Sequence, residues 1–221
     1  MITNTYQSVA LPESIIDLDE AECSCEIENI FNLSWRGYFL FFGAVEPKKN
    51  LARIIEAYLA SGVKTPLVIV GGRAWLDEDE TRMMHDDLIQ VQVIKDGVLR
   101  RADRIRRYDY LPFETLMGLV RGARATLFPS LYEGFGLPIL ESMLLGTPVL
   151  TSTTGACPEI AGDAALLVDP YDTRAIKRGI QALDSDEALR DELSRRGRVQ
   201  AAKFSPQAYE QRLDDLYRKL F

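Results

Sequence analysis

The sequence has few of the residues that build disulfide scaffolds, zinc clusters and histidine-based catalytic triads. Its 221 residues include three cysteines, Cys23, Cys25 and Cys157, and a single histidine, His85. Cys23 and Cys25 are too close in the chain for an ordinary structural disulfide, and no cysteine or histidine has the spacing of a zinc ligand set. We therefore expect free thiols in a reducing, cytoplasmic compartment, no structural zinc site and no triad.

Long apolar runs and an excess of basic charge are also absent. No run approaches the ~20 apolar residues that span a bilayer, and residues 1–5 have neither the basic nor the apolar part of a secretory signal. Acidic residues outnumber basic ones by 33 to 26, which gives a net charge of −7. Because a nucleic-acid binder must neutralise phosphates, we expect a globular protein with no transmembrane segment and no nucleic-acid partner.

Basic residues gather in one short stretch. The cluster consists of Arg100, Arg101, Arg104, Arg106 and Arg107. Its arginines could contact anionic lipid head groups, which would allow peripheral membrane contact. The favoured interpretation is a solvated face whose charge is balanced by nearby aspartates.

The first 34 residues differ from the rest of the chain. They are rich in Asp and Glu and show no sustained hydrophobic period. We interpret residues 1–34 as a leader or linker that wraps the domain, with room for a short helix. Residues 35–221 are then one domain, for which their number is sufficient.

Regular structure is predicted from Tyr38 onward. Buried strands are expected from the apolar runs at 38–42, 67–70, 125–128, 149–151 and 165–168. Helices are expected from about 51, at 77–90, at 112–121, at 137–145 and from 173 to the end of the chain. Asn50 is placed to cap the first of these helices. Residues 91–107 are ambiguous, apart from a short strand near 105–108.

Strands that alternate with helices, and are apolar throughout, predict an α/β fold with a parallel sheet covered on both faces. The expected fold is a single Rossmann-like, doubly wound domain. Ligands of such sheets bind at the carboxyl ends of the strands. The loops after Phe42, Val70, Phe128 and Thr151 are therefore the candidate site.

The loop after Phe128 carries the most informative residues. Gly134 and Gly136 allow a tight turn with exposed backbone, and the helix that follows offers free N–H groups and a positive dipole end to a phosphate. Glu133 and Glu141 flank this helix start. Carboxylates would repel a diphosphate, so we expect them to accept hydrogen bonds from sugar or ribose hydroxyls, with the helix dipole favouring ionised Glu141.

The stretch Glu-Gly-Phe-Gly-Leu-Pro-Ile-Leu-Glu, residues 133–141, resembles the donor-site signature of a known family. The family is the retaining, nucleotide-sugar-dependent glycosyltransferases of the two-domain GT-B type, group 4. The similarity continues through residues 142–149 and 155–170. Upstream, residues 42–51 resemble the first glycine loop of the same domain, which begins at Gly43. The resemblance covers about residues 38–221 and implies the C-terminal, donor-binding half of a GT-B fold.

The resemblance also implies a role for each matching residue. Glu133 would contact the donor sugar and stabilise charge at the anomeric carbon, while Lys49 would neutralise the diphosphate leaving group. Glu141 would bind the ribose hydroxyls. Backbone N–H groups facing the sugar and diphosphate would come from Gly134, Phe135, Gly136 and Leu137. Enzymes of this type are usually independent of metal and need no cofactor, and transfer would proceed with retention and without a protein nucleophile.

The sequence departs from the family pattern in two ways. Many relatives have an arginine just after the first glycine, where this chain has Ala44, and Lys48 is the candidate substitute. The chain also has no room for the N-terminal domain that binds the acceptor. We therefore expect the donor-binding half of a polysaccharide-building glycosyltransferase, inactive without a separate acceptor domain or subunit.

Two alternatives remain. The chain could be a non-catalytic remnant that supports another glycosyltransferase, which Ala44 and the missing domain suggest. It could also be another enzyme of the same fold, an epimerase or a phosphorylase, because folds do not fix functions. The nucleotide base, the sugar and the acceptor stay open.

Overall fold

A computed structural model describes residues 4–72, 90–95 and 98–220, with the backbone alone between 90 and 103. Residues 77–89 of the predicted helix at 77–90 lie outside the described residues, and so does His85. Gln90 is described, and it begins a strand instead. Cys23, Cys25 and Cys157 are free thiols, as expected.

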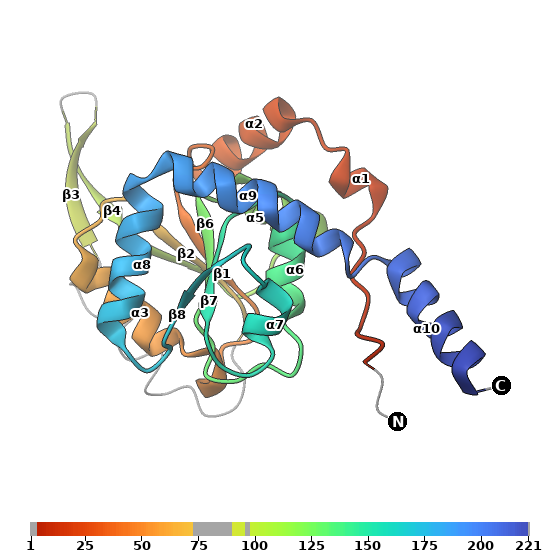
Figure 1. Cartoon of the computed structure of the whole chain (residues 1–221). Coiled ribbons are helices and arrows are strands. Elements are labelled where there is room, and N and C mark those ends of the chain that lie inside the picture. The colour runs from red at the N-terminus through yellow and green to blue at the C-terminus, as the bar shows by residue number, and fades with distance from the viewer. Residues whose placement is uncertain (1–3, 73–89, 96–97, 221) are drawn as a thin grey trace.

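Six parallel strands form one sheet in the order β5-β2-β1-β6-β7-β8 (Figure 1). The strands are β1 (Phe39–Phe42), β2 (Leu67–Val70), β5 (Ile105–Tyr108), β6 (Ala125–Phe128), β7 (Val149–Ser152) and β8 (Leu166–Val168). Central β1 pairs with β2 on one side and β6 on the other. Every residue of β1, β2, β6 and β7 is buried, because helices cover both faces. The predicted doubly wound sheet is confirmed.

Helices flank the sheet on its two faces (Figure 1). They are α3 (Leu51–Ser61), α5 (Phe113–Gly122), α6 (Leu137–Leu144), α7 (Cys157–Ala161), α8 (Thr173–Ser185) and α9 (Glu187–Ala202). Helix α10 (Pro206–Leu220) extends away from the sheet (Figure 1) and has no buried residue. Helices α3 and α8 pack together, and α6 packs with α9. The predicted helical spacing of Leu51, Ile54, Ile55 and Tyr58 is confirmed, since all four are buried in α3.

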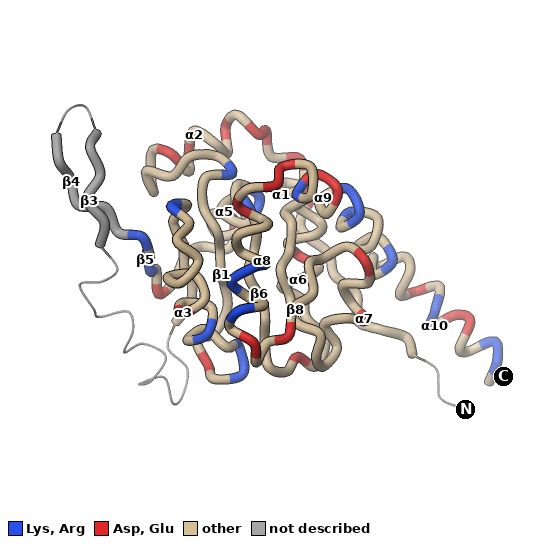
Figure 2. The backbone as a smooth tube through the Cα atoms, turned by 60° about the vertical axis from the view of Figure 1, so that its left-hand side comes forward, with Lys and Arg blue, Asp and Glu red and all other residues tan. Residues whose placement is uncertain are grey.

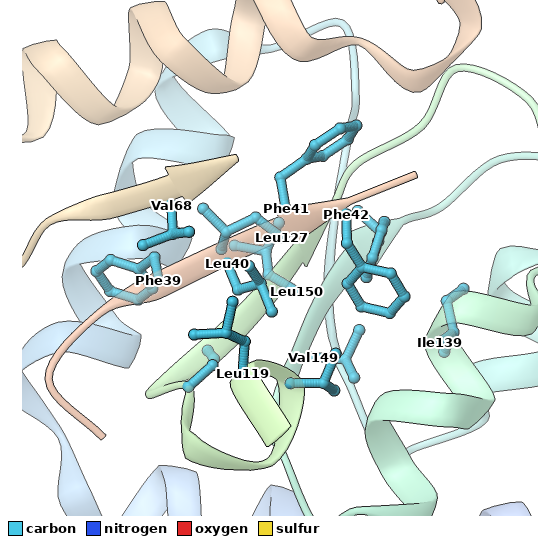
Figure 3. Packing of buried hydrophobic residues seen from close by; sticks show 14 of the residues in the cluster. Phe39, Leu40, Phe41, Phe42, Val68, Leu119, Leu127, Ile139, Val149 and Leu150 are labelled. Carbon is cyan, nitrogen blue, oxygen red and sulfur yellow. The ribbon is translucent and has the colours of Figure 1, made fainter. Parts of the chain in front are cut away.

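The core lies between the sheet and these helices, as Figure 3 shows for Phe39, Leu127, Leu150 and their neighbours. The Phe128 ring meets the Phe42 ring edge to face, with 5.0 Å between centroids. Aromatic pairs of this kind add to the stabilisation that burial gives. The end of β1 is thereby fixed to the end of β6, and the candidate loops follow these two ends.

The first 34 residues contain more structure than their sequence pattern suggests. They form α1 (Glu13–Ile16) and the 12-residue α2 (Glu20–Phe31). Figure 2 shows the acidic residues of α2, whose apolar face buries Cys23, Ile27 and Phe31. These three residues are spaced by four, a helical period, so the expectation of no sustained period was wrong here. Helix α2 packs on α5, and a side chain at Gly122 would collide with Ile27.

The ambiguous region resolves into a hairpin and a strand. Strands β3 (Gln90–Lys95) and β4 (Val98–Asp103) pair antiparallel and project from the domain (Figure 1). Strand β5 follows, as predicted at 105–108. Within the part of the chain that the structure describes, none of the helices is both long and apolar enough to cross a membrane.

Arg104 and Arg106 of the basic cluster bind the protein's own backbone. Arg104 donates to the Val63 carbonyl at 2.7 Å, and Arg106 donates to the Phe31 carbonyl. These two guanidinium groups therefore hold the edge of the sheet together. Peripheral membrane contact stays an untested prediction.

Candidate functional site

The predicted loops meet at the carboxyl edge of the sheet. The Leu131 amide, after β6, donates to the Lys48 carbonyl, after β1, at 2.8 Å. The Thr154 hydroxyl, after β7, donates to the Leu131 carbonyl at 3.0 Å. Three segments that are far apart in sequence thus form one continuous rim, as parallel strands require.

Two glycines leave bare backbone at this rim. A side chain at either Gly43 or Gly134 would meet no atom within 4 Å, so both positions border open space. Gly71, after β2, has no space for a side chain. Its Cβ would lie 1.9 Å from the Gly43 carbonyl oxygen, so the loops after β1 and β2 pack backbone to backbone.

The start of α6 presents unpaired backbone donors to the same space. Gly136 is the N-cap residue, in a left-handed conformation with φ of 108° that favours glycine. Within the described residues, no hydrogen bond is donated by the amides of Gly134, Phe135, Gly136 and Leu137. Free amides at the positive end of a helix form an anion-binding site.

Lys49 and Glu133 meet directly beside these amides. Lys49 Nζ lies 2.7 Å from Glu133 Oε1, and the two side chains are 14% and 12% exposed. Both residues were predicted for the site from positions that are 84 residues apart. Among the described residues, no three His, Cys, Asp or Glu side chains are grouped as metal ligands would be. Lys49 places a positive charge at the rim, where it is paired with Glu133.

Asn50 has a different role from the predicted one. It occupies the N-cap position of α3, but its side chain makes no capping hydrogen bond. Its φ of 63° is left-handed, whereas a capping side chain needs an extended backbone. The Asn50 side-chain amide, through Nδ2, instead donates to the carbonyls of Pro129 and Pro170, each at 2.8 Å. This buried side chain ties the loops after β1, β6 and β8 together.

Glu141 lies in the second turn of α6 and is half-buried. Within the described part of the chain, its carboxylate has no hydrogen bond or ion pair. Burial raises the pKa of the Glu141 carboxyl above its ordinary value. Burial therefore acts against the helix dipole, which was expected to favour the ionised form.

The remaining predicted residues lie at the rim with distinct surroundings. Leu137 begins α6, and Phe135 packs edge to face on Phe204 with 5.9 Å between ring centroids. Ala44 is exposed, and Lys48 pairs with Glu46 at 3.3 Å on the surface. Lys48 thus holds a local partner, and its predicted role as a substitute for arginine stays a prediction.

The loop between β7 and α7 contributes contacts that sequence reasoning did not single out. The Ala156 amide donates to the Glu133 carbonyl at 3.2 Å. A side chain at Gly155 would sit 3.0 Å from the same oxygen, so the loop presses against the Glu133 backbone. In the sequence, the only indication of these contacts was that Gly155 and Ala156 lie within residues 155–170, which resemble the family.

The fold and this edge define a class of protein: a Rossmann-like domain whose carboxyl edge carries a lysine, unpaired amides and two glutamates. The Glycosyl transferases group 1 family matches residues 28–200. The chain is 36% identical over 201 residues to O-antigen chain mannosyltransferase B of Escherichia coli, covering 89% of this chain and 49% of that protein. It therefore belongs to the group 1 glycosyltransferase family, and it spans about half the length of this relative.

Solved structures of low sequence identity share the fold. Sucrose-phosphate synthase from Thermosynechococcus elongatus superposes with a TM-score of 0.73 at 24% identity, over 93% of this chain and 50% of that one. Anabaena HepE in complex with UDP and glucose gives a TM-score of 0.77 at 15% identity, over 95% of this chain and 55% of that one. The predicted GT-B resemblance is confirmed.

Proposed function

We propose that the chain is the donor-binding half of a retaining glycosyltransferase that uses a nucleoside-diphosphate sugar. The observation that carries the proposal is the Lys49–Glu133 pair, 2.7 Å apart, beside the unpaired amides of residues 134–137. A diphosphate fits these donors because amides and an ammonium group both stabilise negative charge. When the donor binds, Lys49 turns to the diphosphate and Glu133 accepts from sugar hydroxyls instead.

Each group then has a chemical task. Cleavage of the bond between the anomeric carbon and the diphosphate leaves negative charge on the departing phosphate oxygen. Lys49 and the amides of the α6 start stabilise that charge as it develops. Glu133, beside the sugar, stabilises the positive charge at the anomeric carbon. Glu141, one turn into α6, holds the ribose hydroxyls.

The transferred sugar is mannose in this proposal. It rests on the relative named O-antigen chain mannosyltransferase B, which matches most of this chain. An O-antigen is a polysaccharide, so we propose a glycan acceptor. Transfer requires a part equivalent to the half of that relative that this chain does not span, whether on the same polypeptide or on another.

Thermal unfolding with UDP, GDP, ADP and their mannose conjugates tests the proposal, with Glu141→Ala as the comparison variant. A ligand at about 100 times its dissociation constant stabilises the fold by about 2.7 kcal/mol, or several degrees in Tm for a domain of this size. We expect stabilisation by one base, reduced in the variant, and that base identifies the donor. An unchanged Tm with every nucleotide would contradict the proposal.

The second candidate function is a non-catalytic remnant that supports a partner glycosyltransferase. Ala44, exposed at the rim where many relatives have an arginine, is the observation that favours it. In that case Lys49 and Glu133 serve only to hold the loops together. The same titration separates the two candidates, since a remnant binds no nucleotide.

A further inference from the structure

A second set of contacts supports the loop between β6 and α6, residues 129–136, which we call the donor loop. These contacts come from the first and last described segments of the chain. Residues 4–9 run beside the junction of α9 and α10 (Figure 1). The Val9 amide donates to the Phe204 carbonyl at 2.9 Å, and Arg212 Nε donates to the Thr5 carbonyl at 2.8 Å. The segment is therefore fixed to this junction on both sides of Tyr6.

The ring of Tyr6 reaches the donor loop through one other ring. It packs edge to face on Phe204, with 5.4 Å between centroids, and Phe204 packs in the same way on Phe135. Phe204 is buried, at 4% exposed. Phe204 thus lies between the rings of Tyr6 and Phe135. Displacement of Tyr6 would free Phe204 to move, and Phe135 would lose part of its packing.

The hydroxyl of Tyr6 reaches the same loop by a different route. It donates to Glu159 Oε1 of α7 at 2.7 Å. The residues just before α7 hold Glu133, since the Ala156 amide donates to its carbonyl and Gly155 packs against its backbone. The hydrogen bond to Glu159 is the main cause of the raised pKa of Tyr6, which keeps the hydroxyl protonated as a donor.

The backbone of Tyr6 shows that this arrangement is specific. Its φ of 55° is left-handed, a strained conformation for a residue with a side chain. The Tyr6 amide donates to the Asn4 side chain at 2.9 Å, and Arg212 lies over the ring. The strained conformation aims the ring at Phe204 and the hydroxyl at Glu159 together.

We propose that Tyr6 is a positioning residue for the donor loop, holding Phe135 through Phe204 and Glu133 through α7. The expected effect on nucleotide binding rests on the proposed function. The expected effect on the conformation of the loop does not depend on it. Tyr6 itself touches no ligand. Its contribution is to keep the loop in the conformation that presents Glu133 and the free amides together.

The test compares wild type with Tyr6→Phe, Glu159→Ala and the double variant, with Tyr209→Phe of α10 as a matched loss of a tyrosine hydroxyl. Tyr6→Phe keeps the ring contact and removes one hydrogen bond, so folding is preserved. Hydrogen exchange of the ligand-free proteins is measured first. We expect faster exchange in residues 130–137 and 154–160 of Tyr6→Phe, with α3 unchanged and Tyr209→Phe like wild type.

Nucleotide affinity is the second readout. We expect Tyr6→Phe to raise the Kd about fivefold, the equivalent of one hydrogen bond. Glu159→Ala should have a similar effect, and the double variant should add little to either. Unchanged exchange in both segments, or an unchanged Kd in a protein that binds nucleotide, would overturn the positioning role. Absence of nucleotide binding in wild type would instead overturn the proposed function, and the exchange result would still decide the role of Tyr6.

Discussion

Lys49 and Glu133 are both mostly buried, and each is the other's ion-pair partner. Removing one partner leaves an uncompensated charge. We predict that Lys49→Met lowers the free energy of unfolding by about 2–4 kcal/mol and abolishes nucleotide binding. Lys48→Met removes an exposed pair and should cost less than about 1 kcal/mol. Urea unfolding of the two variants checks the difference.

The double variant Lys49→Met/Glu133→Gln separates stability from binding. With no charge left unpaired, most of the lost stability should return, while nucleotide binding should not. Recovery of both would mean that Lys49 acts only as a structural partner of Glu133.

The ionised form of Glu141 lowers the stability of the folded protein, whereas the Lys49–Glu133 pair raises it. Its pKa is raised in the folded protein, so the folded state binds protons more tightly than the unfolded chain does. Its ionised form therefore costs stability above the raised pKa, and the cost disappears as the pH falls below about 4.3, the value for an unfolded chain. We predict that Glu141→Gln raises Tm at pH 7, not at pH 4, while weakening nucleotide binding. Glu210→Gln, on exposed α10, is the matched control, and equal Tm changes in the two variants would contradict this account.

At the scale of elements, Asn50 holds three connecting loops in place. We predict that Asn50→Ala destabilises the fold by about 3 kcal/mol, from two unpaired carbonyls and a left-handed alanine. Asn50→Gly loses the same hydrogen bonds without the backbone strain, so it should be about 1 kcal/mol less destabilised. Thermal unfolding of the pair checks this order. A less stable Gly variant would show that the left-handed backbone is not the source of the difference.

The elements that could be predicted from the sequence are those with a local signal. Apolar runs predicted five of the six strands of the sheet, all except β5, and the helix predicted at 137–145 matches α6. Helix α2 was not predicted beyond a short helix, because three buried residues are scattered among acidic ones. The role of Asn50 depends on carbonyls 79 and 120 residues away, which no local pattern reveals.

The site residues followed from a long motif, but their relations to one another did not. The sequence indicated that Lys49 and Glu133 share a ligand, and the structure adds that they pair with each other. The sequence also placed Glu141 near a helix start, but it did not indicate that burial would raise the pKa of this carboxyl. Support from Tyr6 could not be foreseen, because it requires both ends of the chain to meet.

At the scale of the whole molecule, the described residues form a six-stranded parallel sheet whose carboxyl edge is the proposed binding site for a diphosphate. The groups that would stabilise a diphosphate at the proposed site are Lys49 and the unpaired backbone amides of residues 134–137. A second phosphate group should therefore add at least one charge-assisted hydrogen bond, a gain of about 1.5–3 kcal/mol.

Calorimetric titration of the chain with a nucleoside diphosphate and with the monophosphate of the same base tests this claim most directly. We expect the diphosphate to bind at least about tenfold more tightly, and Lys49→Met/Glu133→Gln to lose this preference. Equal affinity for the two nucleotides, or a preference that persists in the double variant, would contradict it.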